Sequence, residues 1–445
     1  MNYITEPEKQ LPVCYEADVF VAGGSCTGVF AAVRAARMGA KVVLVERANC
    51  FGGTATAGLV NIWHSLKDTD YKNQVIAGLT GEMTERLEKS GSAILTDDPS
   101  TAIKFDPNRL KYELDKLVIE EKIKVYLHTI CVGALCENDE IIAAIIENKD
   151  GRSAVKAKFY IDATGDGDLM KYLGVTSYRE NTLQPPTPCF LWQGDLEGVD
   201  HRKLIAEHGS EFGLPDDFGW SEDVPGLPNI TLRADFHVFG VDCSKADDLT
   251  YTEIEGRRKA YALTELLRKY SDADPRIVGL NSLAGIRETV HYKTKYKADG
   301  WDMLYGKRYD DAILQGTYRI DMHDKDGGVK FFYLNGKTVY MKGAERNYVF
   351  GNWREENGVA IPEAKYYQIP FSVLVQEQYK NIIAAGRMLN ADPMAYGALR
   401  VMVNLNQLGE AAGVAAVTAI DSCGDVRKIS GVDVRKKLIS GGSAL

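Results

Sequence analysis

The first fifty residues arrange apolar and small residues in a pattern that predicts a strand, a helix and a second strand. Residues 17–22 (ADVFVA) are apolar, partly β-branched and followed by glycine, which is typical of a buried strand. Residues 27–38 carry alanines at helical spacing, and Gly39 ends that helix. Residues 41–46 (KVVLVE) follow as a second buried strand. The pattern therefore predicts a βαβ unit with parallel strands.

A further helix, strand and hairpin are predicted before residue 162. The Asp-Pro pair at 106–107 favours a helix start, because aspartate caps helices and proline suits the first helical position. A leucine-patterned helix follows, and residues 124–128 (KVYLH) then predict another parallel strand. The apolar runs 140–147 and 153–161 flank an Asp-Gly pair at 150–151, which is a strong signal for a hairpin.

The pattern changes at about residue 181, where prolines and aromatic residues become frequent, and it reverts at about residue 365. The elements predicted in these later parts are a helix at 252–270, strands at 328–335, 337–342 and 381–385, and a small-residue helix at 402–419. The chain is therefore predicted to have an α/β fold. A doubly wound Rossmann-type domain would comprise residues 14–180 and 365–425, with an α+β substrate or cap domain inserted at 181–364.

Composition excludes several classes of protein. The 445 residues suffice for two or three domains, and the net charge of −9 with interspersed acids and bases argues against nucleic-acid binding. No window has the roughly 20 apolar residues of a membrane helix, and the amino terminus lacks a signal-peptide pattern. The eight cysteines show no metal-binding spacing, which favours reduced thiols and a soluble cytoplasmic protein.

The loop between the first strand and helix has the character of a dinucleotide-binding turn. It contains Gly23, Ser25, Cys26, Thr27 and Gly28. A pyrophosphate binds at such a helix start because the free N–H groups and the helix dipole favour negative charge. Gly23 would make the turn and Gly28 would let helix and strand approach. Ser25 replaces the usual middle glycine, so an empty α/β turn remains the alternative.

Four further features indicate which nucleotide binds. Glu46, 18 residues after Gly28, is placed to accept hydrogen bonds from the adenosine ribose hydroxyls. A second glycine loop at 52–58 includes Gly53 and Thr54, and an extended flavin needs such a loop along its ribityl chain. A third, at 162–168, contributes Ala163, Thr164, Gly165 and Asp168, and a fourth begins at 385–387. The helix beyond the fourth loop would face the N1–O2 edge of the flavin ring and stabilise charge there. FAD is the predicted cofactor.

Across nearly its whole length the chain resembles the bacterial FAD-dependent oxidoreductases of the glutathione-reductase-like structural class. The resemblance rests on DVFVAGGSCTGVFAAVRAARMGAKVVLVER, FGGTATAGLV, AKFYIDATGDGDL, GIRET, YQIPFSVLV and NIIAAGRMLNADPMAYGALRVMVNLNQLGEAAGVAA. It implies FAD contacts by Gly23, Gly28, Glu46, Arg47, Gly53, Thr164, Gly165, Gly386, Arg387, Arg400 and Gly409, and a backbone contact from Val132 to the adenine. Two departures are Ser25-Cys26 in place of glycine-proline, and Asp392-Pro393-Met394 where similar proteins often carry a threonine-histidine pair.

Five side chains are candidates for the reacting site. His64 follows the second glycine loop, and Arg287 lies in GIRET as a possible anchor for a substrate carboxylate. His291 would share a face with Arg287 if that segment is helical, and His323 and Tyr396 complete the set. Each has a structural alternative: a packed or surface histidine, an internal ion pair, or a packed tyrosine.

The other histidines (128, 201, 208 and 237) have no motif around them, and we assign them no chemistry. Asp166 and Asp168 lie in a loop that the flavin explains, so no metal site is predicted.

The function predicted from these features is hydride exchange between the flavin N5 and a small polar metabolite that is hydroxylated or carboxylated, with a sugar-like compound as one such metabolite. No second dinucleotide motif appears, so no nicotinamide domain is indicated. Two alternatives stay open: an NAD(P)H-dependent flavin monooxygenase, and a non-catalytic electron-transfer flavoprotein. The substrate, the electron acceptor and the oligomeric state are not specified by the sequence.

Overall fold

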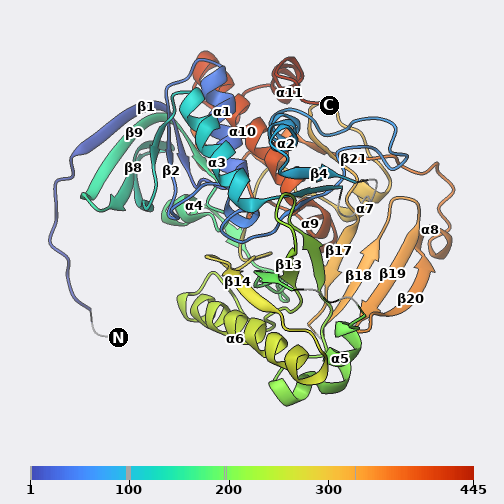
Figure 1. Cartoon of the computed structure of the whole chain (residues 1–445). Helices are drawn as coiled ribbons and strands as arrows, with labels where there is room; N and C mark the ends of the chain where they lie inside the picture. Colours follow the sequence, from blue (N-terminus) through green and yellow to red (C-terminus); the bar gives the residue numbers. More distant parts are fainter. Residues whose placement is uncertain (1–2, 97–101, 195, 197, 326) are drawn as a thin grey trace.

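A parallel sheet forms the central layer of the first part of the chain (Figure 1). The computed structural model describes residues 3–96, 102–194, 196, 198–325 and 327–445. The parallel strands run in the order β6 (Lys124–Tyr126), β2 (Val42–Val45), β1 (Val13–Ala22), β9 (Gly151–Asp162) and β22 (Ile382–Ala384). The predicted α/β fold with a parallel sheet is confirmed. Residues near the amino terminus and residues beyond 380 thus lie in one sheet.

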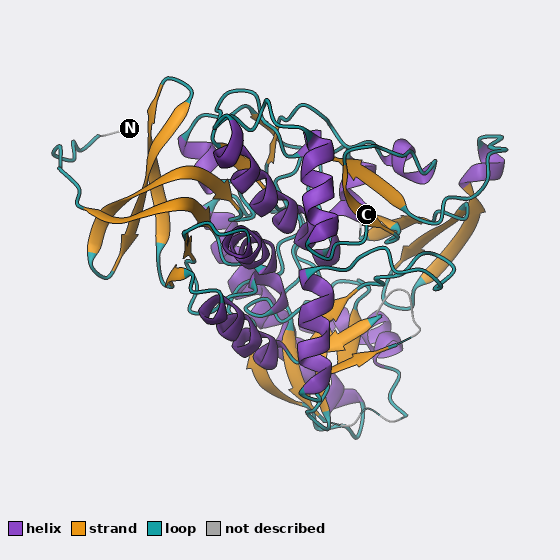
Figure 2. Ribbon diagram, turned by 90° about the horizontal axis from the view of Figure 1, so that it is seen from above, coloured by secondary structure: helices purple, strands orange, loops and turns teal. Residues whose placement is uncertain are grey.

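An antiparallel extension continues this sheet from the first half of β9. Strand β8 (Glu140–Asn148) forms an antiparallel hairpin with β9, and β7 (Ile130–Glu137) pairs with the other edge of β8. These strands project from one side of the molecule (Figure 2). The turn between β8 and β9 contains Gly151 with φ of 92°, a left-handed value that glycine adopts without strain. The predicted hairpin is confirmed.

Helices cover the two faces of the parallel sheet, and each face has its own core. Alternate residues of β1 divide between these cores: Val19 and Val21 pack on one side, and Phe20 and Ala22 on the other. The first core lies against α1 (Cys26–Arg37) and α10 (Met402–Ser422), with α2 (Leu79–Lys89), α3 (Pro107–Glu120) and α11 (Gly431–Ser440) alongside. The second lies against α4 (Asp168–Tyr172). Predicted helices at 27–38, 108–121 and 402–419 are therefore present.

The remaining part of the chain contains two antiparallel four-stranded sheets. One has the order β12 (Trp220–Asp223), β13 (Ile230–Ala234), β11 (Phe190–Gln193) and β14 (Arg276–Leu280), with α5 (His201–His208) and α6 (Ala246–Tyr270) beside it. The other consists of β17 (Ile320–His323), β18 (Gly328–Phe332), β19 (Lys337–Lys342) and β20 (Asn347–Asn352). Both lie on the side of the molecule away from the parallel sheet (Figure 1).

Shorter elements connect these layers. Their bounds are β3 (Ile62–Trp63), β4 (Ala93–Leu95), β5 (Ile103–Phe105), β10 (Ser177–Tyr178), β15 (His291–Tyr292), β16 (Ala312–Gly316), β21 (Tyr367–Pro370), α7 (Gly300–Leu304), α8 (Trp353–Glu356) and α9 (Pro393–Leu399). Ala298, Leu304, Ile313 and Leu314 belong to the same core as α1 and α10. The inserted segment therefore contributes to the core of the first domain, and the proposed division at 181 and 365 stays a prediction.

In the part of the chain that the structure describes, no helix combines the length and apolar character that a membrane span needs.

Candidate functional site

A cavity of about 800 Å³ lies between the glycine loops of the parallel sheet and the β17–β20 sheet. Its inner part is lined by residues that follow β1, β2, β9 and β22, and its outer part by residues of β12 and β17–β20. A volume of this size is at the upper end of the range for ligand sites in proteins, which suits a large cofactor together with a substrate.

The β1–α1 turn places the start of α1 against this cavity. Gly23 has φ of 95°, and a side chain on Gly28 would overlap the carbonyl oxygen of Gly23. Ser25 caps the helix by accepting a hydrogen bond from the Gly28 N–H at 3.5 Å, and Ser25, Cys26 and Thr27 line the cavity. The helix start thus offers backbone N–H groups and the positive end of its dipole to an anion.

Glu46 lies at the junction between this cavity and a smaller one of about 40 Å³. Its carboxylate accepts hydrogen bonds from the Gly24 N–H at 2.6 Å and the Ala48 N–H at 2.7 Å. The smaller cavity is also lined by Gly23, Arg47, Thr129, Ile130, Cys131, Thr164 and Asp168. Burial, with the nearby charges of Asp162 and Asp166, raises the pKa of Asp168 to about 7. A nucleoside placed here would extend from the pyrophosphate turn toward β7.

The other glycine loops contribute small residues and one arginine to the large cavity. Gly53, Thr54, Ala163, Thr164, Gly165 and Gly386 line it. Arg387 donates from Nη2 to Asp166 at 3.0 Å, while its buried Nη1 has no partner among the described residues. A buried guanidinium nitrogen without a partner is costly, and an anionic ligand in the cavity would satisfy it.

The start of α10 lies against the same cavity, which Val401, Met402, Leu405 and Asn406 line. No described side chain caps this helix at Val401. Its free N–H groups and dipole would therefore stabilise negative charge on a group bound there.

Three residues predicted to contact the cofactor lie outside the lining of both cavities. Gly28 and Gly409 bring backbones together, since a side chain on Gly409 would overlap the Thr27 carbonyl of α1. Val132 lies on β7, next to the residues that line the smaller cavity. Close packing of α1 on α10 is the role that the structure shows for Gly409.

Three of the five predicted catalytic residues line the large cavity: His64, Arg287 and His323. Arg287 donates from Nη1 to the Pro185 carbonyl at 2.7 Å and to Thr187 Oγ1. Its Nε and Nη2 have no hydrogen-bond partner among the described residues and remain available to a ligand. Burial, aided by the charge of Arg400, lowers the pKa of Arg287 to about 10, so it stays cationic at neutral pH.

His291 and Tyr396 lie behind Arg287 and outside the cavity lining. The segment 285–290 is not helical, and His291 belongs to β15, so the condition under which it would share a face with Arg287 is not met. His291 bonds to the Leu389 carbonyl at 2.8 Å and to Glu288 at 3.0 Å. Tyr396 donates to the Arg287 carbonyl at 2.6 Å. Both side chains therefore support the segment that carries Arg287.

The features of the inner cavity fit an extended dinucleotide: two helix starts, close glycine loops and an unsatisfied guanidinium. A family model described as FAD dependent oxidoreductase matches residues 18–438. The chain belongs to the FAD dependent oxidoreductase family. FAD is its cofactor, and the protein is an enzyme of the FAD-dependent oxidoreductase type.

Comparison with solved structures gives distant similarities. A geranylgeranyl bacteriochlorophyll reductase-like protein from Thermoplasma acidophilum is 11% identical, with 96% of this chain and 83% of that chain covered and a TM-score of 0.45. The flavin-dependent brominase Bmp2 is 12% identical (95% and 83% covered, TM-score 0.45). The p-nitrophenol 4-monooxygenase PnpA from Pseudomonas putida DLL-E4 is 11% identical (96% and 85%, TM-score 0.42). No curated protein matches the chain. These similarities assign no substrate to this member of the family.

His237 also lines the cavity of this FAD dependent oxidoreductase, although no motif surrounds it in the sequence. Its Nδ1 lies 2.9 Å from Asp217 Oδ2, and its backbone N–H donates to the same carboxylate at 2.7 Å. Burial raises the pKa of Asp217, but the His237 imidazole and the backbone donors outweigh this and hold it below its ordinary value. The ionised carboxylate keeps the proton on Nδ1 and leaves Nε2 as the proton acceptor.

His323 lies beside the first histidine and close to a second aspartate. Its ring centroid is 4.7 Å from that of His237, and its Nε2 lies 3.2 Å from Asp321 Oδ1. Burial, partly opposed by Asp321, lowers the pKa of His323 to about 3, so it is neutral at physiological pH. Asp321 is in turn paired with Arg400 at 3.0 Å. Arg400, predicted to contact the cofactor, thus lines the cavity and pairs with Asp321.

Proposed function

We propose that this FAD-dependent oxidoreductase exchanges a hydride between the flavin N5 and a small hydroxylated metabolite that carries an anionic group. The observation that supports this proposal is one cavity lined by the glycine loops, the Arg287 guanidinium and two histidines, one oriented by Asp217 and the other lying 3.2 Å from Asp321. These are the components that oxidation of a hydroxyl-bearing carbon requires: an anchor, a base and a redox cofactor.

FAD supplies the acceptor for the hydride when it is bound. In the direction of substrate oxidation, Arg287 holds the substrate anion through Nε and Nη2 and so positions the carbon to be oxidised. The hydroxyl proton passes to His237 Nε2 as the C–H electron pair leaves and the carbon–oxygen double bond forms. Asp217 then stabilises the imidazolium, because it accepts from Nδ1 at 2.9 Å.

His323 completes the environment of the base. As a neutral ring next to His237, it adds no further positive charge to that of Arg287, which already disfavours protonation of His237. Its Nδ1 is buried and has no partner among the described residues, so it can accept a hydrogen bond from a substrate hydroxyl. His64 lies against Tyr318, with ring centroids 4.0 Å apart, and forms part of the wall.

Anaerobic reduction of the purified holoenzyme tests this proposal. Hydroxycarboxylates and sugar acids are mixed separately with the oxidised enzyme, and the visible absorption of the flavin is followed. At least one such compound is expected to bleach the flavin without NADH or NADPH. Bleaching by NAD(P)H alone would instead favour the monooxygenase. Bleaching by no small molecule, with a flavin potential that responds to a protein partner, would favour an electron-transfer subunit.

A matched pair of variants tests whether Arg287 binds the anionic group of the substrate. Arg287→Gln is expected to raise the KM of the identified substrate by about tenfold or more, because a charge-assisted contact is lost. Arg268→Gln, which changes an exposed ion pair with Asp274, serves as the control. An unchanged KM in Arg287→Gln would remove Arg287 from the substrate site.

A further inference from the structure

One face of the β17–β20 sheet forms the floor of the outer cavity. The lining residues alternate along the strands: Asp321 and His323 on β17, Phe331 on β18, Lys337, Val339 and Met341 on β19, and Tyr348 and Phe350 on β20. The register pairs Asp321 with Phe331, Phe331 with Val339, and Val339 with Phe350. Because side chains alternate between faces, the cavity continues across the full width of the sheet.

The far end of this floor carries cations that have no carboxylate partner. Arg202 and Arg346 line the cavity there, and neither forms an ion pair with a described residue. Lys337 also lines the cavity, but it begins β19 at the end opposite to Arg346, which lies in the β19–β20 turn. Arg346 donates from Nη2 to the Gly219 carbonyl, and its Nε is buried without a partner in the described chain.

The carboxylates that line the cavity are engaged elsewhere. Glu46 accepts from two backbone N–H groups, Glu222 pairs with Lys104, and Asp321 pairs with Arg400. Burial and the neighbouring charge of Arg346 lower the pKa of Arg202, which shows that the two guanidinium groups repel each other. An anion between them would remove this repulsion and satisfy Arg346 Nε.

Mainly apolar residues line the cavity between these two arginines and Arg287, and the Arg319 guanidinium lies among them, 4.5 Å from the centroid of the Phe331 ring. Phe331, Val339 and Met341 are buried and pack in one cluster with Phe218. Arg287 lies near the β17 end of the sheet, since its positive charge lowers the pKa of His323 and of His237. From β17 to β20 there are three interstrand spacings, roughly 14 Å in all. A ligand that reaches both ends is therefore elongated.

We propose that Arg202 and Arg346 form a second anion-binding subsite, so that the substrate is an elongated dianion with a largely apolar middle. This proposal rests on the proposed function for the end near Arg287. The second anionic group is a carboxylate or a phosphate, since both accept charge-assisted hydrogen bonds from guanidinium groups. The apolar middle would lie on Phe331 and Val339.

Equilibrium binding to the oxidised holoenzyme tests the subsite without requiring turnover. The probes are straight-chain dicarboxylates of increasing length, the matching monocarboxylates and the matching phosphonocarboxylates, each titrated by the change in the flavin's visible spectrum. A dicarboxylate or phosphonocarboxylate of the right length is expected to bind about tenfold tighter than its monocarboxylate. A gain for the phosphonocarboxylate alone would identify phosphate as the second group.

Three variants test which residues cause the tighter binding of the dianion. Arg202→Gln is the most informative, because Arg202 has no hydrogen bond or ion pair to the described residues and its replacement disturbs no internal contact. It is expected to abolish the tenfold gain and leave monocarboxylate binding unchanged, and Arg346→Gln should do the same. Lys330→Gln is the control, because Lys330 is exposed on the same sheet but outside the cavity lining.

The proposal is overturned if no length of either dianion binds tighter than the monoanion, or if the gain survives in both arginine variants. Failure of the proposed function gives a different result. In that case Arg287→Gln would leave the binding of mono- and dianions unchanged, whatever Arg202→Gln does.

Discussion

The Asp217–His237 pair is the contact on which the proton step depends. His237→Gln keeps a polar side chain of similar size but removes the proton acceptor. The rate of flavin reduction by substrate is expected to fall by about 10²–10⁴-fold, the usual contribution of a general base, with FAD content unchanged. Stopped-flow absorbance of the reductive half-reaction measures this. His208→Gln, at a histidine beside α6 that stacks on Tyr270, is the control. A reduction rate equal to that of the unaltered enzyme would exclude His237 as the base.

The buried His323 makes stability depend on pH. Its pKa is lowered from 6.5 to about 3 by burial, so below pH 6.5 the unfolded chain takes up a proton that the folded chain does not. The free energy of unfolding should therefore decrease as pH falls from 6.5 toward 3, by up to about 1.4 kcal/mol per pH unit from this residue. Urea unfolding at several pH values measures the slope. His323→Gln should show a shallower decrease, and an unchanged slope would contradict the assignment.

Motifs allowed some of these side chains to be found from the sequence, but not others. Arg287 and the glycine loops lie in recognisable segments, and the structure places them along one cavity. His237 and Asp217 are 20 residues apart in irregular segments, and only tertiary folding brings them together. The spacing of His291 from Arg287 predicts a shared face only in a helix, and the segment between them is not helical. Spacing identifies neighbours only where the local structure is regular.

Replacing a helical glycine by alanine either stabilises or destabilises the protein, depending on what packs against that glycine. Gly81 in α2 has open space around it, whereas a side chain on Gly413 in α10 would overlap the Ala31 carbonyl of α1. Gly81→Ala is expected to stabilise the protein by about 0.5–1 kcal/mol, and Gly413→Ala to destabilise it by about 1–3 kcal/mol. Thermal unfolding measures both. Equal effects of the two substitutions would show that α1 and α10 do not pack this closely.

The βαβ unit, the hairpin and α10 were predictable because their hydrophobic patterns match the period of their secondary structure. The β17–β20 sheet was harder to recognise, since only its middle strands have clear apolar alternation and its β20 residues Tyr348, Val349 and Phe350 are exposed. The hydrophobic pattern also does not show that residues of the 181–364 segment share a core with α1 and α10. Residues such as Ile313 pack into the first domain's core, a contact that depends on the tertiary fold.

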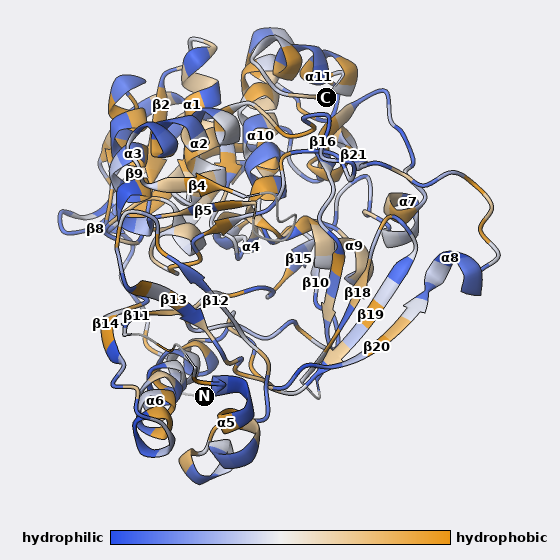
Figure 3. Ribbon diagram, turned by 45° about the vertical axis from the view of Figure 1, so that its right-hand side comes forward, coloured by the Kyte–Doolittle hydropathy of each residue, from blue (hydrophilic) through white to orange (hydrophobic). Residues whose placement is uncertain are grey.

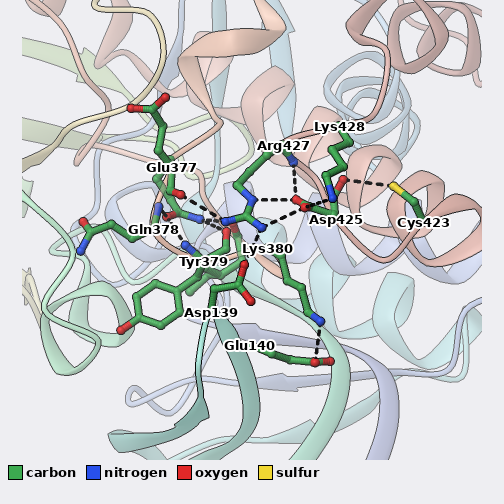
Figure 4. Close-up of polar contacts among 12 residues, drawn as sticks. Asp139, Glu140, Glu377, Gln378, Tyr379, Lys380, Cys423, Asp425, Arg427 and Lys428 are labelled. Carbon is green, nitrogen blue, oxygen red and sulfur yellow. Dashed lines mark hydrogen bonds and ion pairs between the residues drawn. The ribbon is translucent and has the colours of Figure 1, made fainter.

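Across the whole molecule, a polar cluster ties the carboxyl-terminal segment to the β7–β8 turn (Figure 4). Arg427 bonds to Asp425 at 2.8 Å and to Asp139 at 2.6 Å, and it also reaches the Glu377 carbonyl. Arg427→Gln is expected to lower the free energy of unfolding by about 1–2 kcal/mol, because the buried Asp425 loses its guanidinium partner and keeps only the Lys428 ammonium, at 3.2 Å, as an ion-pair partner. Chemical denaturation measures the change. Lys436→Gln, in an exposed pair with Asp433, should cost less than about 0.5 kcal/mol. Equal losses would mean that the cluster adds nothing to stability.

The cavity itself is assembled from parts distant in the sequence. Its inner wall comes from residues near 25, 165 and 387, and its outer wall from residues between 202 and 350. Figure 3 shows the β18–β20 strands, which carry apolar and polar residues together, on the far side of the molecule from α1. This arrangement places the cofactor loops at one end of the cavity and Arg202 and Arg346 at the other.

The most direct test of this account is anaerobic single-turnover reduction with a substrate deuterated at its hydroxyl-bearing carbon. The account predicts that substrate alone bleaches the flavin, that deuterium slows this bleaching, and that the slowing persists at saturating substrate. Bleaching that needs NADH or NADPH, or that proceeds at the same rate with the labelled and unlabelled substrate, would contradict direct hydride transfer in this cavity.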